Sequence, residues 1–168
     1  MIVERGVTHI GENIKSVSQI LAVDNAIYAS GDILIAGSNE LADFFLTEGG
    51  NAILQTVIIR SNKGTGTLQD PDLDVLIISK SGLTGTANDA FAFAGGIDKD
   101  DVTAVISFIG TDYKTMGASD NIAIKTDLNL PIIADSSTRA LNFTIISRDT
   151  PTYAADGQVT IEFIGYRN

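Results

Sequence analysis

Hydrophobic and polar residues alternate in two runs near the end of the chain. The first run sets Leu141, Phe143 and Ile145 against Asn142 and Thr144. The second sets Val159, Ile161 and Phe163 against Gln158, Thr160 and Glu162. Because successive side chains of a strand point to opposite faces, the pattern predicts two half-buried β-strands. Between them, Pro151 cannot donate to a strand ladder and favours an extended Thr150.

Shorter apolar runs precede these two and are separated by turn-forming residues. Residues 52–60 are rich in β-branched side chains, and residues 73–78 are apolar on both faces, as in a central strand covered on both sides. Further strand candidates are residues 14–21, 26–35, 102–109, 122–125 and 131–134. A polar loop, residues 61–66, follows the run at residues 52–60, and residues 63–67 are interpreted as a hairpin loop. Eight or nine short strands favour a sandwich or barrel, and we predict an all-β, two-sheet β-sandwich with at most one or two short helical segments.

Two segments have features of a helix. Residues 38–49 combine a polar cap candidate, apolar residues at helical spacing and a terminal glycine, which favours one short helix; a strand over residues 44–46 is the alternative. Residues 97–101 are expected to form a single helical turn. The chain shows no internal repeat and no linker. We therefore expect a single β-sandwich domain over residues 14–168, preceded by an N-terminal arm of residues 1–13.

Composition narrows the possible functions. At 168 residues with 44% hydrophobic content, one domain can bury a core without covalent staples. The net charge of −10 opposes binding to nucleic acid and to anionic membranes. No apolar run reaches the roughly 18 residues of a membrane helix, and the first residues lack the pattern of a signal peptide. The absence of cysteine and the single histidine, His9, exclude disulfides, thiolate sites and a multi-histidine metal site within one subunit.

Candidate chemistry is sparse. The alternating carboxylates of residues 70–74 (DPDLD) could hold Ca²⁺, but they lack the glycine and distal glutamate of an EF-hand loop. A turn leading into a strand is the preferred interpretation, and a solvated loop or helix cap is preferred for Asp98, Asp100 and Asp101. Loop 63–67 lacks the spacing of a phosphate-binding loop, and no Gly-x-Ser-x-Gly motif occurs. We therefore predict no enzyme, no catalytic residue, no metal and no cofactor.

Two residues that flank the connector of the last two strands are candidates for a protein interface. Arg148 and Tyr153 belong to residue types that are enriched at interface hot spots. The alternative is structural. In that case Tyr153 packs over the end of its own sandwich, and Arg148 pairs with Asp149 or another acid.

Several segments together resemble a family of small β-rich virion proteins, the jelly-roll capsid decoration or cement proteins of tailed bacteriophages. The similar segments are residues 50–57 (GNAILQTV), 73–78 (LDVLII), 88–90 (NDA), 105–108 (VISF), 112–113 (DY), 129–131 (NLP) and 148–153 (RDTPTY). The last two are the most specific. The resemblance covers roughly residues 50–168, and residues 43–45 (DFF) have no counterpart in the family.

The resemblance implies a jelly-roll-like virion protein without catalysis. Proteins of this family commonly form trimers on the capsid surface, where they bridge neighbouring subunits of the major capsid protein. The implied partners are therefore the major capsid protein of the same phage and further copies of the chain, as a homotrimer. The alternatives are a phage tail or baseplate module and a host-adhesion module that binds carbohydrate, because the sandwich fold alone does not fix function.

Overall fold

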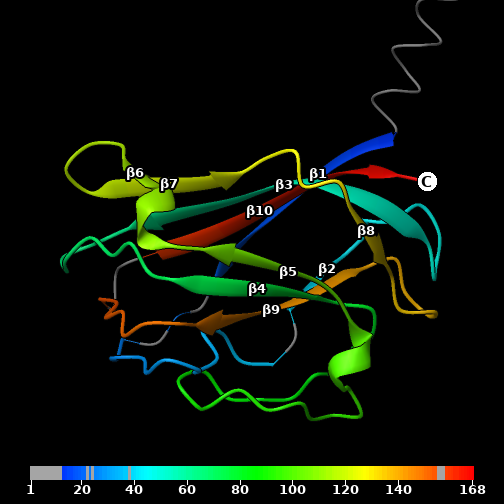
Figure 1. Ribbon diagram of the computed structural model, residues 1–168, viewed down its shortest axis with the longest axis horizontal. Coiled ribbons are helices and arrows are strands. Elements are labelled where there is room, and N and C mark those ends of the chain that lie inside the picture. The colour runs from blue at the N-terminus through cyan, green and yellow to red at the C-terminus, as the bar shows by residue number, and fades with distance from the viewer. Residues whose placement is uncertain (1–12, 22, 24, 38, 155–157) are drawn as a thin grey trace, which may run out of the picture.

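The computed structural model describes residues 13–21, 23, 25–37, 39–154 and 158–168, and it contains two antiparallel sheets packed face to face (Figure 1). The six-stranded sheet has the order β1 (Ile14–Leu21), β10 (Gln158–Arg167), β3 (Asn51–Asn62), β7 (Asp120–Lys125) and β6 (Tyr113–Thr115), with β8 (Leu130–Ile133) also paired to β3. The four-stranded sheet has the order β2 (Asn39–Leu41), β9 (Leu141–Ser147), β4 (Leu73–Ile78) and β5 (Val102–Phe108). The predicted all-β, two-sheet sandwich is confirmed.

The helical elements within the described ranges are two short 3₁₀ turns, η1 (Lys99–Asp101) and η2 (Gly110–Asp112). The first confirms the helical turn expected at residues 97–101, and the Asp98 side chain caps it by accepting from the backbone N–H of Asp100. Over the described ranges, no helix is long and apolar enough to cross a bilayer.

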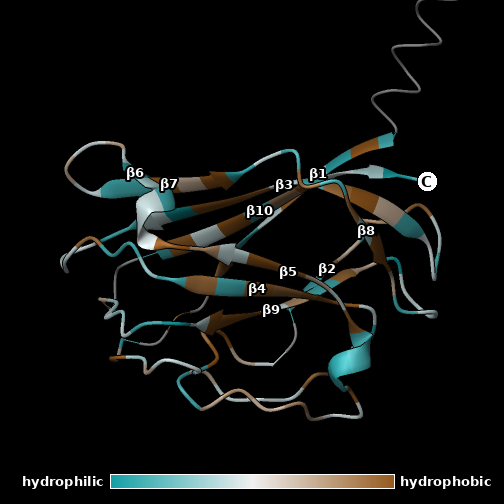
Figure 2. Ribbon diagram, in the orientation of Figure 1, coloured by the Kyte–Doolittle hydropathy of each residue, from teal (hydrophilic) through white to brown (hydrophobic). Residues whose placement is uncertain are grey.

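The main core lies between the two sheets and is built from the inward side chains of both (Figure 2). Phe143 of β9 and Phe163 of β10 meet there with ring centroids 4.9 Å apart, and both are fully buried. These are positions that the sequence pattern assigned to the inward face. The alternation in the two runs therefore selects the layer that each strand faces.

A second, smaller core lies on the other side of the four-stranded sheet. Residues 79–98, here called the covering segment, fold across this outer face (Figure 1, bottom). The buried members of this core are Leu76, Ile78 and Ile146 from the sheet and Leu83 and Ile97 from the covering segment or its end. Asn142 and Thr144, which point outward from β9, are consequently buried as well. The expectation of a half-buried strand is right for β10 and wrong for β9.

Residues 39–49 form neither the predicted helix nor a strand over 44–46; residue 38 lies outside the described residues. The short strand β2 is followed by a turn in which Asp43 has a φ of 57°. This left-handed conformation does not continue a right-handed helix. Phe44 and Phe45 are both buried with their rings edge to face, so the apolar residues serve the main core. Residues 26–35 likewise form only isolated bridges, at Ile27, Asp32 and Ile33.

The loop at residues 63–67 is not the predicted hairpin loop. β3 belongs to the six-stranded sheet and β4 to the four-stranded sheet, so the chain between them crosses from one layer to the other. The expected arm of residues 1–13 lies almost wholly outside the described residues. β1 begins at Ile14, where the domain was predicted to begin.

One irregularity shapes the centre of the six-stranded sheet. The register of β10 against β3 shifts between Ile164 and Gly165, which leaves Gln55 of β3 as the extra residue of a bulge. On its other edge, β3 pairs with β7 after this point and with β8 before it. The Gln55 carbonyl accepts the backbone N–H of Leu128 at 3.1 Å, so the β7–β8 connection is anchored at the bulge.

Candidate interaction surface

The two residues singled out as interface candidates lie in different environments. Tyr153 is only 3% exposed, and its ring packs edge to face on Tyr28 with centroids 5.8 Å apart. Burial, with the nearby Asp149 carboxylate, raises the pKa of Tyr153 far above its ordinary value. Arg148 is exposed, and its Nε donates to the Asp74 carboxylate at 2.6 Å. This arrangement matches the structural alternative for both residues.

The carboxylates of residues 70–74 have separate partners. Asp70 accepts from the side-chain amide of Asn121, and Asp72 accepts the backbone N–H of Gly110 at 2.7 Å. Asp74 pairs with Arg148. Across the described residues, no group of three or more His, Asp or Glu side chains is placed to hold a metal ion. The three carboxylates therefore bind neighbouring segments of the chain to one another.

The second acidic group has a similar structural role. Asp101 accepts the backbone N–H of Asp98 at 3.0 Å and pairs with Lys80 at 2.8 Å. The hydrogen bond from Lys80, followed by that from Asp98, lowers the pKa of the Asp101 carboxyl. The pair links the start of the covering segment to η1. Nothing in this geometry supplies a general acid or base.

The outer face of the six-stranded sheet is different, because no described segment covers it (Figure 1, top). The register and the burial pattern place alternate side chains of β1, β10, β3 and β7 on this face. Its apolar members are Ile14, Ile20, Ile53, Ile58, Ile122, Ile124, Ile164 and Tyr166. Ile124 is 47% exposed and Tyr166 48%, whereas Leu76, Ile78 and Ile146 on the outer face of the other sheet are buried.

Charges on this outer face are balanced, although the whole chain carries −10. The outward positions of β1, β10, β3, β7 and β6 hold two cations, Arg60 and Lys114, and two anions, Glu162 and Asp120. Arg60 and Glu162 form an ion pair at 2.8 Å. The Ser16 hydroxyl, and then Arg60, lower the pKa of the Glu162 carboxyl. The excess negative charge therefore lies on other parts of the molecule, and this face can approach another protein without strong repulsion.

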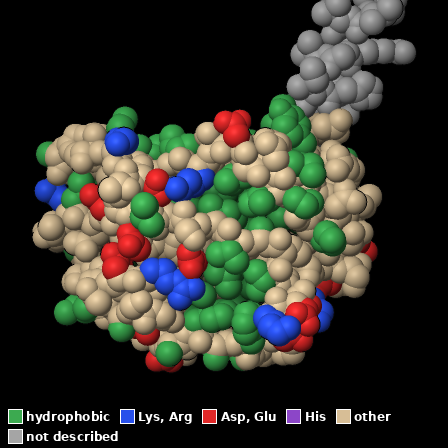
Figure 3. Space-filling view, in the orientation of Figure 1, with side chains coloured by type: hydrophobic (Ala, Val, Ile, Leu, Met, Phe, Trp, Pro, Cys, Tyr) green, Lys and Arg blue, Asp and Glu red, His purple; other side chains and the backbone are tan. Residues whose placement is uncertain are grey.

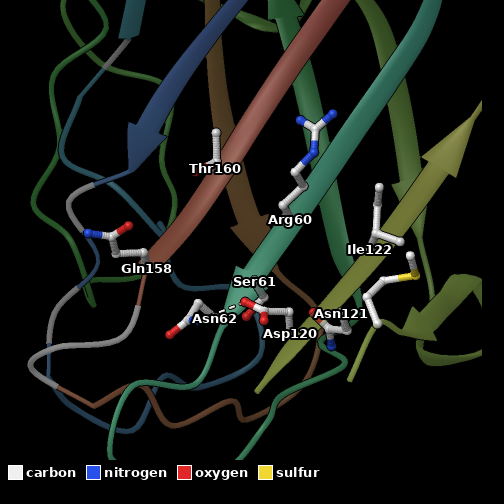
Figure 4. Close-up of a pocket in the computed structure, with 9 residues that line it drawn as sticks. Arg60, Ser61, Asn62, Asp120, Asn121, Ile122, Gln158 and Thr160 are labelled. Atoms are coloured by element: carbon white, nitrogen blue, oxygen red, sulfur yellow. Dashed lines mark hydrogen bonds between the residues drawn. The ribbon is translucent and has the colours of Figure 1, made fainter. Parts of the chain in front are cut away.

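The outer face is hollowed at each end. At one end a hollow of about 510 Å³ is lined by residues from β3, β7 and β10 (Figure 4). There Arg60, Thr160 and Ile122 project from three strands, and Asn62 donates to Asp120 at 2.7 Å. The hollow has polar walls and one aliphatic side, which suits the side chain of a protein partner better than a reaction centre.

The hollow at the other end, of about 530 Å³, lies at the bulge. It is lined by Ile14, Gln55, Thr56, Thr126, Asp127, Ile164, Gly165 and Tyr166. Asp127 has a φ of 56°, a left-handed conformation that is uncommon outside glycine. The Asn129 side chain accepts from Gln55 at 2.9 Å and holds this connection against β3. The bulge at Gln55 and the β7–β8 connection together form the walls of this hollow, which is the groove beside Tyr166.

A second apolar area lies on the side of the sandwich where β5 forms the edge (Figure 3). Its exposed members include Val105, 53% exposed, and Ile109, 50% exposed. Charged side chains surround it in ion pairs, among them Arg148 with Asp74. On β5 the inward residues are buried, so Val105 is exposed on the strand's other face. It provides a comparison site for mutagenesis.

Part of the apolar outer face can be predicted from the sequence. Along β10 the polar positions Gln158, Thr160 and Glu162 are followed at the same spacing by Ile164 and Tyr166, so the outward row turns apolar. No local signal marked the bulge at Gln55. No protein-family model matches this chain, and no curated protein matches it.

Proposed function

We propose that the protein is a virion structural protein that decorates and stabilises the outside of a tailed-bacteriophage capsid, without catalysis. In this proposal the outer face of the six-stranded sheet binds the major capsid protein. The observation that carries the proposal is this face itself, which is uncovered, rich in isoleucine and electrically balanced on a chain of net charge −10. The family resemblance of residues 50–168 supplies the capsid as the partner.

The size of the face explains why such a protein would act in many copies. The five strands of this face range from three residues in β6 to twelve in β3. At about 3.3 Å per residue and about 4.8 Å between strands, they give a footprint of about 600 Å². A stable pairwise complex usually buries about 800 Å² on each partner. One copy would therefore bind weakly, whereas an oligomer on a repeating shell multiplies the contacts. Binding in several copies is compatible with the homotrimer, which the resemblance alone implies.

The charge distribution supports the same orientation. With the outer face against the shell, the acidic surfaces point to solvent and keep the decorated particle soluble. The covering segment would then lie on the side away from the shell. We expect decorated heads to resist heating better than undecorated heads, because each bound copy connects neighbouring capsid subunits.

Binding can be tested with heads assembled from the major capsid protein encoded in the same genome as this chain. Ile124→Asp places an uncompensated charge at an exposed position of the outer face, on β7. Co-sedimentation with heads should then fall by at least tenfold, for a loss of about 1.4 kcal/mol or more. Val105→Asp is the matched control, because Val105 is similarly exposed but lies on β5. Equal binding by both variants, or no binding by the unmodified chain, would contradict the proposal.

A carbohydrate-binding adhesion module is the second candidate, and one observation favours it. The groove at the bulge places the half-exposed ring of Tyr166 beside the polar side chains of Gln55 and Asp127. An aromatic ring next to hydrogen-bonding groups is suited to a sugar. Under this alternative, Tyr166→Ala abolishes binding to host-cell polysaccharide while head binding is absent from the start.

A further inference from the structure

β1 is a long strand with one free edge. It pairs along all eight residues with β10 only, and within the described part of the chain no strand lies on its other side. The strand has no proline and no register shift, and Lys15 is its single charge. Natural edge strands are usually short, bulged or charged, because an open ladder of N–H and C=O groups invites another strand. β1 has little of this protection.

The other long edge strand, β5, is less open. Its inward residues Ala104, Ile106 and Phe108 are buried, and β8 of the opposite sheet lies close to it. β1 also has a strand of the opposite sheet near it, the three-residue β2, through the Gln19–Asn39 side-chain hydrogen bond of 2.9 Å. On β1, by contrast, the inward residue Val17 is only partly buried, while Ile14 is 38% and Ile20 62% exposed on the outward side. A strand added to β1 would bury apolar surface on both faces.

We propose that β1 pairs antiparallel with β1 of a second copy, across a two-fold axis at Val17. Even-numbered residues of β1 face outward, so joining two equivalent sheets edge to edge, with their outer faces on the same side, requires even-numbered residues to oppose even-numbered ones. The register centred on Val17 satisfies this condition and pairs seven residues. It sets Ile14 against the partner's Ile20 and Ser16 against the partner's Ser18.

Charge and apolar contacts select this register over its neighbours. Lys15 meets the partner's Gln19, so no like charges are opposed despite the strongly acidic chain. A register centred on Ser18 leaves Ile14 without an opposing β1 residue, and one centred on Ser16 leaves Ile20 without one. Of these three registers, only the one centred on Val17 sets both exposed isoleucines, Ile14 and Ile20, opposite an apolar residue. Cross-strand pairs of apolar side chains stabilise antiparallel strands.

The contact is self-complementary, as a two-fold interface must be. It joins two six-stranded sheets into one continuous sheet and doubles the number of strands that form the outer face. It does not depend on the proposed capsid role. Any trimer would use a separate three-fold contact, and β1 pairing would then connect trimers in twos.

Because the chain has no cysteine, single cysteines report the register directly. Opposed residues of an antiparallel pair have Cα atoms about 4.5–5.5 Å apart, within disulfide range, whereas diagonal neighbours are about 7–8 Å apart. A mixture of Ser16→Cys and Ser18→Cys chains should therefore form disulfide dimers under mild oxidation, while either variant alone should form few. The expected excess is roughly tenfold or more, because pairing raises the effective thiol concentration.

Val17→Cys gives an independent test that leaves both serines in place. It should form dimers alone, since residue 17 opposes itself, and Val105→Cys on β5 reports random collision. The unmodified chain should run as an even-numbered oligomer in light scattering at micromolar concentration. Cross-linking of the mixture no faster than that of the single variants, Val17→Cys no faster than Val105→Cys, or a monomeric mass would overturn the proposal. Capsids are absent from these experiments, so their outcome is independent of the proposed function.

Discussion

The Asp135 carboxylate holds the start of the covering segment against the β8–β9 connection. One oxygen accepts the backbone N–H and the hydroxyl of Ser81, at 3.0 and 3.2 Å. The other accepts the backbone N–H and the hydroxyl of Ser137, at 2.9 and 2.7 Å. These four donors, led by the backbone N–H groups of Ser81 and Ser137, lower the pKa of Asp135 from its ordinary 3.8 to about 2. Asp135→Asn removes the charge and one of the two acceptor oxygens.

The expected loss of stability follows from this pKa. A pKa lowered to about 2 corresponds to about 2.5 kcal/mol in favour of the charged, folded form when solvent screening is ignored. The carboxylate is partly exposed, so we expect about half of this, about 1 kcal/mol. Since the folded-state pKa lies below the unfolded one, the contribution is complete above about pH 5. It disappears as the pH falls from about 4 through 2.

Urea unfolding followed by far-UV circular dichroism measures the effect, because the chain has no tryptophan to report by fluorescence. Asp135→Asn should lower the free energy of unfolding by about 1 kcal/mol at pH 7 and by much less at pH 2.5. Asp100→Asn is the control, because the Asp100 side chain is 79% exposed and pairs only with its neighbour Lys99. The reasoning is refuted if the two variants behave alike at pH 7, or if the Asp135→Asn deficit is unchanged at pH 2.5.

Two further substitutions test the packing that shapes the site. Gly165→Ala should destabilise the fold by about 1–3 kcal/mol, because the new Cβ would lie 2.9 Å from the Ile53 carbonyl oxygen and 3.0 Å from the Phe44 ring; an unchanged midpoint in urea would be inconsistent with this close approach. Thr144→Val should be neutral or stabilise by about 1 kcal/mol, because the buried Thr144 hydroxyl has no hydrogen-bond partner among the described residues. A clear loss of thermal stability in Thr144→Val would argue against that prediction.

The sequence predicted the strands well where the side chains themselves decide the conformation. The β-branched run at residues 52–60 lies within β3, and the uniformly apolar residues 73–78 are β4, which is covered on both faces. Alternation in residues 158–163 also identified the half-buried β10. In each case a period of two and a β-forming composition act locally, and tertiary contacts agree with them.

The predictions were wrong where contacts between segments far apart in the sequence determine the structure. Asn142 and Thr144 have the pattern of a solvent-facing row, yet the covering segment, more than forty residues earlier in the chain, buries them. The loop at residues 63–67 has the composition of a hairpin loop, but the strands on either side of it do not pair. β3 pairs with β10, β7 and β8, and β4 lies in the other sheet. In the segment predicted as a helix, residues 38–49, Asp43 has a left-handed backbone conformation that a right-handed helix does not contain. Phe44 and Phe45, which follow it, are buried in the core.

The candidate surface could be predicted only in part, for the same reason. The apolar ends of the outward rows, Ile14 and Ile20 in β1 and Ile164 and Tyr166 in β10, are visible in the sequence once the strands are assigned. Which face stays uncovered depends on where the covering segment folds, and the groove depends on the bulge at Gln55. Neither is set by local composition.

The central claim is that the outer face of the six-stranded sheet is the side that meets the capsid. A cryo-EM density map of heads bearing this protein tests it most directly. The account predicts that the exposed Ile124 and Tyr166 lie against the major capsid protein, with the covering segment turned to solvent. A map in which the covering segment or the β5 side lies against the shell, or in which no density for the chain is present, would contradict it.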